Sequence, residues 1–162
     1  MSTHKLFIRR ADGSVDPASS QDVLAAARAV LAHRVRRGAL LQTPQQVGEY
    51  LTVRLGHLDH ECFGLILVDG RHRVIECVEL FRGTIDAAAV YPREVVKLAL
   101  EKRAAAVIAY HNHPSGVNEQ SAADELITRR LAQSLSAIEV RLLDHLVLAG
   151  SEVLSFAQKG LL

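Results

Sequence analysis

The segment AAAVIAYHNHPSGVNEQSAAD spans residues 104–124. Its first seven residues are apolar and bounded, which predicts a short buried strand. Pro114 cannot donate to a β-ladder, so the strand should stop there, and Ser115 with Gly116 lets the chain turn back. Ser121 and the residues ADELITRRLAQSL that follow predict a capped helix. The segment therefore reads as a strand, a loop and a helix in direct succession.

Two histidines lie at the end of the predicted strand. His111 and His113 are two residues apart, so on a strand their side chains project from one face and can reach one metal ion. Asp124 follows His113 by eleven residues and falls in the first turn of the helix, where its carboxylate can point back to the strand. Two imidazoles and one carboxylate match a catalytic zinc site, which keeps a fourth position for water. We therefore predict a Zn²⁺ site formed by His111, His113 and Asp124.

Each part of this pattern also has an ordinary structural explanation. Ser121 and Asp124 fit a helix N-cap followed by an acidic residue at the third helical position, which alone is usually structural. Histidines beside loops are common, and most of them bind nothing. The combination of strand, HxHP sequence, small-residue loop and capped helix is what favours a metal site.

The rest of the chain predicts further elements around this segment. Upstream, CFGLILVD and HRVIECVELF flank the turn residues Asp69 and Gly70, which favours an antiparallel β-hairpin. Helices are expected over residues 20–38, with Ser20 as N-cap, and over 43–56 and 92–103, and two more strands over 140–149 and 152–156. Residues 1–19 predict only a short strand or arm and a turn. The sum is an α/β fold, a mixed sheet with helices packed on it.

The composition fits one globular domain. The chain has 162 residues, of which 49% are hydrophobic, enough for a core without disulfides or a structural metal. We divide it into an N-terminal arm and helix over residues 1–43 and a main domain over residues 44–162. The 19 basic and 18 acidic residues nearly balance, so net charge gives no strong attraction to nucleic acid or anionic membranes.

Cysteine usage and hydropathy indicate the compartment. Cys62 and Cys77 lack a CxxC spacing and are too few for a disulfide framework, which favours a reducing environment. The N-terminus has no apolar signal-peptide core, and no apolar run approaches the roughly 20 residues of a membrane-spanning helix. We therefore expect a cytoplasmic protein without membrane insertion or secretion.

A known family shares these motifs. His111-Asn112-His113-Pro114, then six residues, Ser121, two residues and Asp124, is similar to the complete signature HxHPx6SxxD of the JAB/MPN (JAMM) metalloprotease superfamily. The stretches YPREVVKLALEKRAAAVIAYHNHPSG and LLDHLVLAGSEVLSF resemble its RadC branch, and the likeness covers roughly residues 44–162. The resemblance implies an MPN-type α/β/α sandwich around a mixed sheet, similar in layout to cytidine deaminases.

The resemblance also implies an activity. Related JAMM enzymes hydrolyse peptide or isopeptide bonds with zinc, often at a ubiquitin-like tail, and use a glutamate at the head of an upstream strand as general base and then general acid. Glu61 matches that position, while Glu76 and Glu79 remain alternatives, with Glu79 the stronger of the two. Ser121 is expected to donate a hydrogen bond to the developing oxyanion. The expected reaction is amide hydrolysis.

The chain also departs from the RadC pattern. Long RadC proteins carry an N-terminal helix-hairpin-helix region, and residues 1–43 show no such motif, so we expect a short-form member. A DNA-associated role in repair or recombination is the alternative function. Its support is the family name and three basic clusters, which are HRVRRG at 33–38 (with Arg34, Arg36 and Arg37), Arg9-Arg10 and Arg129-Arg130. A silent MPN module that binds a partner is the third hypothesis, disfavoured because the ligand set is complete.

Several other residues are interpreted as structural. Cys62 lies within an apolar strand and is expected to be a buried neutral thiol rather than a nucleophile. His145 in LLDHLVLA is expected to be a hydrogen-bonded core histidine, oriented by Asp144, rather than a fourth ligand. The histidines near turns are interpreted as surface residues, namely His57, His60 and His72.

Overall fold

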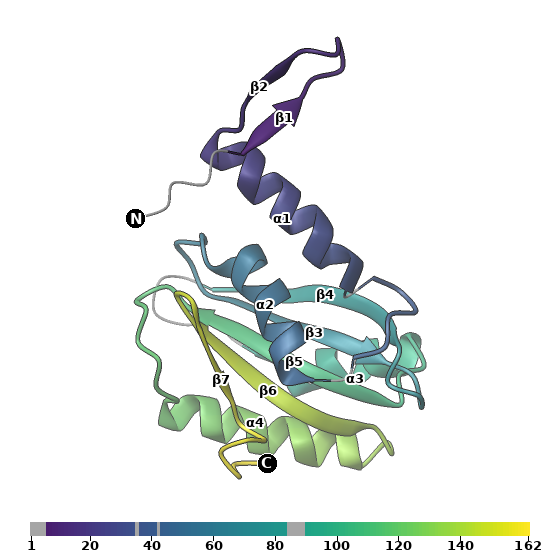
Figure 1. Ribbon diagram of the computed structural model, residues 1–162. Helices are drawn as coiled ribbons and strands as arrows, with labels where there is room; N and C mark the ends of the chain where they lie inside the picture. Colours follow the sequence, from purple (N-terminus) through teal and green to yellow (C-terminus); the bar gives the residue numbers. More distant parts are fainter. Residues whose placement is uncertain (1–5, 35, 42, 84–89) are drawn as a thin grey trace.

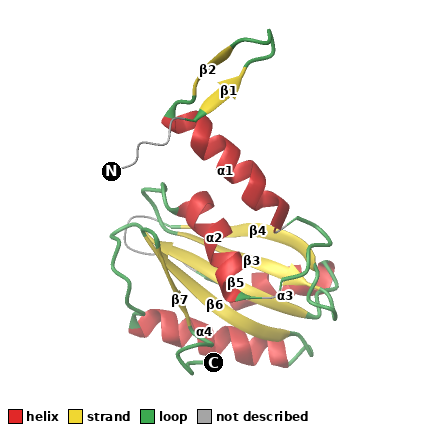
Figure 2. Ribbon diagram, in the orientation of Figure 1, coloured by secondary structure: helices red, strands yellow, loops and turns green. Residues whose placement is uncertain are grey.

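The computed structural model describes residues 6–34, 36–41, 43–83 and 90–162 (Figure 1). Its centre is a five-stranded sheet with the order β4-β3-β5-β6-β7. The strands are β3 (Cys62–Val68), β4 (Val74–Arg82), β5 (Ala106–His113), β6 (Arg141–Ala149) and β7 (Glu152–Ser155). Only β5 and β6 pair in parallel, and the other neighbours are antiparallel. The predicted α/β fold with a mixed sheet between helices is confirmed (Figure 2).

One face of the sheet is covered by α3 (Pro92–Glu101) and α4 (Ala122–Ser136). Parallel strands need a crossover connection, and α4 supplies it between β5 and β6. Leu131 and Leu135 of α4 share a buried cluster with Val107 and Ala109 of β5. This packing brings the end of β5 and the start of α4 to the same edge of the molecule.

The opposite face is covered by α2 (Pro44–Leu55). Its side chains Val47 and Leu51 pack in a second buried cluster with Ile108 and Tyr110 of β5. The expected cap is confirmed, because the Thr43 hydroxyl accepts from the amide of Gln46 and proline fills the first helical turn. Side chains of β5 therefore alternate between the α2 face and the α4 face, as the two-residue period of a strand requires.

The N-terminal part differs from the expectation. Residues 6–18 form a hairpin of β1 (Phe7–Arg9) and β2 (Val15–Pro17), whereas the sequence predicts a short strand or arm followed by a turn and no second strand. Helix α1 (Ser20–Arg34) extends with this hairpin away from the sheet (Figure 1). Its cap is Ser19, not the predicted Ser20, because the Ser19 hydroxyl accepts from the Asp22 amide at 3.2 Å. The first five residues of the predicted arm lie outside the described residues.

Helix α1 ends before the predicted stop at Gly38. The amide of Gly38 donates to the carbonyl of Val74, and the amide of Val74 donates to the carbonyl of Ala39. These contacts with the start of β4 replace the helical hydrogen bonds, so the chain leaves the helix early. Among the described residues, no helix is both long and apolar enough to cross a lipid bilayer.

Candidate metal centre

Three polar side chains converge where β5 ends and α4 begins. Nε2 of His111 lies 3.0 Å from Nε2 of His113 and 3.2 Å from Oδ1 of Asp124. Nε2 of His113 lies 3.5 Å from Oδ2 of Asp124. The exposed fraction of the side chain is 2% for His111, 11% for Asp124 and 17% for His113. The structure therefore brings the predicted ligands together in a cluster whose more open side is at His113.

The spacing of this cluster fits one small metal ion. Atoms that share a tetrahedral zinc at the usual bond lengths lie about 3.3 Å from one another. Nε2 of His111 lies close to that distance from Nε2 of His113, at 3.0 Å, and from Oδ1 of Asp124, at 3.2 Å, and one donor atom from each residue lies within 4.8 Å of the others. Two imidazoles and a carboxylate are also donors that zinc prefers. In the part of the chain that the structure describes, this is the one cluster of that kind.

The charges within the cluster suit a cation. Burial by itself would raise the pKa of Asp124, but hydrogen bonds with His111 and His113 outweigh it and hold the pKa well below its usual range. The same contact with Asp124 raises the pKa of His113 against the effect of burial. Asp124 is therefore ionised at any physiological pH, and a positive charge between the three side chains is favourable.

This electrostatic balance makes zinc binding depend on pH. His113, with its raised pKa, holds a proton more strongly than an ordinary imidazole, and zinc must displace that proton. We expect the apparent zinc affinity to fall about tenfold per pH unit below the pKa of His113 and to level off above it. Competition with a chelator at a series of pH values measures this. A constant affinity from about pH 5 to about pH 8 would show that His113 does not bind the metal.

A capping box holds the carboxylate of Asp124 in place. The Ser121 hydroxyl accepts from the Asp124 amide at 3.1 Å and donates to Oδ2 of Asp124 at 2.7 Å, while the Ser121 amide donates to the same oxygen at 2.8 Å. The capping motif expected from the sequence is confirmed. Oδ2 is thus occupied by Ser121, and Oδ1 is the oxygen left to bind a metal.

Replacing Ser121 by alanine tests this arrangement. We expect the free energy of unfolding of the metal-free protein to fall by about 1 kcal/mol, because the helix loses its cap. Zinc should also bind several-fold more weakly, because Oδ2 of Asp124 loses its hydroxyl donor. Urea denaturation and zinc competition measure the two effects. Ser121→Thr keeps the hydroxyl and should restore both; equal behaviour of the alanine variant and the wild type would contradict the assignment.

The loop after β5 fixes the ring of His113. Nδ1 of His113 lies 3.0 Å from the carbonyl oxygen of Val117, which can only accept, so Nδ1 carries a proton. The amide of Gly116 donates to the carbonyl of His113, and Gly116 has a φ of 75°, which favours glycine. The loop folds back over its own histidine as expected, and Nε2 of His113 faces the cluster.

Glu61 lies beside this cluster. It directly precedes β3, whose residue Phe63 pairs with His111, and two residues along a strand share one face. Its carboxylate contributes to the raised pKa of His113, which places it within electrostatic reach of the ligands. Glu61 is thus on the α4 face, the face of the metal cluster.

The two alternative glutamates lie elsewhere. Glu79 pairs with Gly64, whose face is that of Tyr110 and α2, and its carboxylate accepts from Arg82 at 2.9 Å. Glu76 pairs with Leu67 at the far end of β3 and forms an ion pair with Lys102. Glu79 therefore lies on the face of the sheet opposite the two histidines, and Glu76 lies at the opposite end of the strands.

Asn112, between the two histidines, holds the backbone on both sides of Glu61. Its Oδ1 accepts from the amide of Cys62 at 2.8 Å, and its Nδ2 donates to the carbonyl of His60 at 2.9 Å. The residue is buried. The backbone of Glu61 is therefore tied to β5 by its two neighbours.

Asn112→Ala is expected to loosen this backbone and leave the ligands in place. Both hydrogen bonds are lost, so the Cys62 amide should exchange with solvent at least tenfold faster, while zinc still binds with nearly wild-type affinity. Amide hydrogen exchange followed by NMR measures the first effect. The matched control is Asn118→Ala in the following loop, and unchanged exchange at Cys62 would show that Asn112 does not hold Glu61.

Comparison with known proteins bears on the family. The model of a family described as "RadC-like JAB domain" matches residues 41–161. The chain belongs to this RadC-like JAB family. It is 52% identical to the UPF0758 protein of Shewanella amazonensis over 148 residues, which cover 91% of this chain and 66% of that protein. The UPF0758 proteins of Shewanella oneidensis and Shewanella baltica are 51% identical to it over 148 residues, which again cover 91% of this chain and 66% of each relative.

These matches confirm the resemblance to the RadC branch that the stretches YPREVVKLALEKRAAAVIAYHNHPSG and LLDHLVLAGSEVLSF indicated. The matched segment spans less than two thirds of the length of these UPF0758 relatives. The short form without a helix-hairpin-helix region therefore stays a prediction, as does the domain division at residue 43. The names of these relatives state no activity.

Sequence reasoning missed part of the surroundings of His111. His145 is fully buried as expected, but its ring contacts His111 and Thr128, and Asp144 does not orient it. The Asp144 carboxylate accepts instead from the His145 amide and from the Ser155 hydroxyl. Burial lowers the pKa of His145 well below its usual range, so the ring is neutral.

Among the described residues, Cys62 is a buried thiol, and two of the three basic clusters lie on different elements. Cys62 is buried, and burial raises the pKa of its thiol to about 12, which confirms the neutral thiol. Arg10 lies on the N-terminal hairpin and pairs with Asp16, whereas Arg129 lies on α4, on the far side of the sheet, and pairs with Glu125 (Figure 1). The side chain of Arg34 lies outside the described residues. The clusters on the hairpin and on α4 are thus on different parts of the molecule.

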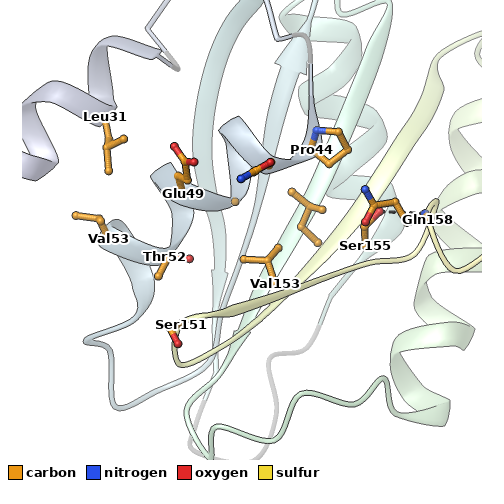
Figure 3. A pocket seen from close by; sticks show the side chains of 12 residues that line it. Leu31, Pro44, Glu49, Thr52, Val53, Ser151, Val153, Ser155 and Gln158 are labelled. Carbon is orange, nitrogen blue, oxygen red and sulfur yellow. Dashed lines mark hydrogen bonds between the residues drawn. The ribbon is translucent and has the colours of Figure 1, made fainter.

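The RadC-like fold also contains a wide groove away from the metal cluster. It encloses about 730 Å³ between α1, α2 and β7 (Figure 3). Leu31, Glu49 and Val153 are among its lining residues. Leu146, which belongs to the α2-side core, also lines it, so the groove lies on the face of the sheet opposite the histidines.

Proposed function

We propose that this RadC-like chain is a zinc-dependent hydrolase of peptide or isopeptide bonds. The observation that carries the proposal is the convergence of His111, His113 and Asp124 at the spacing of a tetrahedral site with three protein ligands. A catalytic zinc uses three protein ligands, whereas a structural zinc is usually closed by four. A bound zinc would supply a Lewis acid and a water whose pKa falls toward about 7.

Glu61 is proposed to move the proton. It lies on the face of the ligands, and its carboxylate acts electrostatically on His113, one of the candidate ligands. It would take the proton of the attacking water on a carboxylate oxygen and pass it to the leaving nitrogen. Asn112 supports this role, because it holds the backbone on either side of Glu61.

Ser121 has a clear positioning role toward Asp124. Its predicted role as oxyanion donor stays a prediction, because its single hydroxyl proton is directed to Oδ2 of Asp124 at 2.7 Å. Donation to a substrate would require that proton to turn away from the carboxylate. The Ser121→Ala variant separates the two roles, since a positioning role affects zinc affinity and an oxyanion role affects kcat.

The substrate class is part of the proposal. The family resemblance supports an amide bond as the bond that is cleaved. Where that bond is an isopeptide, the expected substrate carries a ubiquitin-like tail. A cytoplasmic location is proposed with it, supported by the two free cysteines, Cys62 and Cys77.

The direct test is hydrolysis of a panel of peptides and isopeptide-linked lysine derivatives by the zinc-loaded protein. We expect turnover that a chelator removes and added zinc restores. The His113→Ala variant is the matched negative control, because it has the same fold elements but lacks one ligand. A zinc-loaded protein that leaves the whole panel intact, at a level equal to this variant, would contradict peptidase activity.

A further inference from the structure

A buried line of polar side chains runs from α4 to the metal cluster. Nδ1 of His111 lies 2.9 Å from Nε2 of His145, and Nδ1 of His145 lies 2.6 Å from the hydroxyl of Thr128. The Thr128 hydroxyl lies 2.6 Å from the backbone carbonyl of Asp124. All three side chains are at most 2% exposed. The line therefore connects the backbone of one candidate ligand with the ring of another.

The chemistry of these groups fixes the direction of every hydrogen bond. The Asp124 carbonyl only accepts, so the Thr128 hydroxyl donates its one proton there and must accept from Nδ1 of His145. A neutral imidazole has one N–H, so Nε2 of His145 has a lone pair and accepts from Nδ1 of His111. Nε2 of His111 then presents its lone pair to the cluster.

The opposite direction would not permit metal binding by His111. If Nε2 of His145 carried the proton, it would donate the hydrogen bond, and Nδ1 of a neutral His111 would have to be the acceptor. Nε2 of His111 would then carry its own proton toward His113 and Asp124, where a ligand needs a lone pair. The hydroxyl of Thr128 thus selects the tautomer of a ring that it does not touch.

Aromatic packing keeps the ring of His145 in position. Phe63 contacts it edge-on with ring centroids 5.7 Å apart, and Phe156 lies against it at 5.1 Å. His145 sits on β6 opposite Ala109 of β5, in a fully buried part of the sheet. A ring held between two phenyl groups cannot readily flip to exchange its two nitrogens.

We propose that His145 and Thr128 are positioning residues that set the tautomer and orientation of His111 for metal binding. The inference rests on the proposed zinc site. Removing a group that hydrogen-bonds the second nitrogen of a metal-binding histidine usually lowers the metal affinity by about 10- to 100-fold.

The first test reads the tautomers directly in the metal-free protein. Long-range ¹H–¹⁵N NMR of the imidazoles should show the proton on Nδ1 in both His111 and His145. In Thr128→Val, which removes only the hydroxyl, we expect a mixture of tautomers at both rings. A proton on Nε2 of His145 in the wild type would overturn the proposal whether or not the protein binds zinc.

The second test measures the zinc dissociation constant by competition with a chelator. Thr128→Val and His145→Leu should weaken binding by about 10- to 100-fold, and Thr128→Ser, which restores the hydroxyl, should bind like the wild type. A purely structural role would not distinguish valine from serine in this way. If the wild type binds zinc and Thr128→Val binds it equally well, the inference fails while the zinc site stands; a wild type that does not bind zinc refutes the proposed function instead.

Discussion

Replacing Glu61 by glutamine is expected to lower kcat for amide hydrolysis by at least about 100-fold, while zinc remains near one per chain. Glutamine has almost the same shape but cannot take a proton, and a positioned general base contributes about 10²- to 10⁴-fold. The three ligands and the two hydrogen bonds of Asn112 are untouched by the change. Steady-state kinetics with the best substrate of the panel, together with elemental analysis, measure the effect.

Glu79→Gln is the matched control for this prediction. Glu79 is the alternative glutamate, but it lies on the α2 face and pairs with Arg82, so its loss should leave kcat nearly unchanged. The reverse pattern, with Glu79→Gln inactive and Glu61→Gln active, would show that the general base was assigned to the wrong strand.

Asp124→Asn is expected to weaken zinc binding by more than about 100-fold, a larger loss than removing a group that only supports a ligand. Asparagine keeps the shape of the side chain but removes the negative charge, which is buried between His111 and His113. Competition with a chelator measures the affinity, and thermal unfolding in the presence of excess chelator shows whether the fold persists.

The neighbouring carboxylate provides the control for Asp124. Glu125→Gln changes the same helical turn, but Glu125 pairs with Arg129 on the surface and lies outside the cluster. It should therefore bind zinc with wild-type affinity. Equal zinc affinity in the Asp124 and Glu125 variants would remove Asp124 from the ligand set.

Local sequence features predict much of the fold and the ligand set. The bounded apolar run predicts β5, Pro114 predicts its end, and the capping pattern at Ser121 predicts the start of α4. The three ligands are therefore predictable from their positions at the end of this strand and the start of this helix. The sequence pattern places the cap of α1 one residue too late, because Ser19 and Ser20 are both serines and only the hydrogen bond from the Asp22 amide to the Ser19 hydroxyl distinguishes them.

Long-range packing explains what the sequence leaves open. The ladder between β3 and β4 shifts register after Phe63, so that Phe63 pairs with Phe81 but Gly64 pairs with Glu79. This bulge turns Glu79 to the α2 face, whereas a regular ladder would have placed it on the face of the histidines. No local pattern announces the bulge, and Glu61 and Glu79 were therefore both reasonable candidates.

The role of His145 is hidden for a similar reason. It is separated from His111 by 34 residues and from Thr128 by 17 residues, and the three come together only because β5 pairs with β6 and α4 packs against β6. In the sequence, His145 resembles any polar residue within an apolar strand.

Metal content tests the central claim most directly. The wild-type protein, purified without added metal, should contain close to one zinc per chain by elemental analysis, and the double variant His113→Ala, Asp124→Ala should contain almost none. Both proteins should show the same circular dichroism, so that the loss reports the site and not the fold. A wild type that holds no zinc even after zinc is supplied would contradict the account.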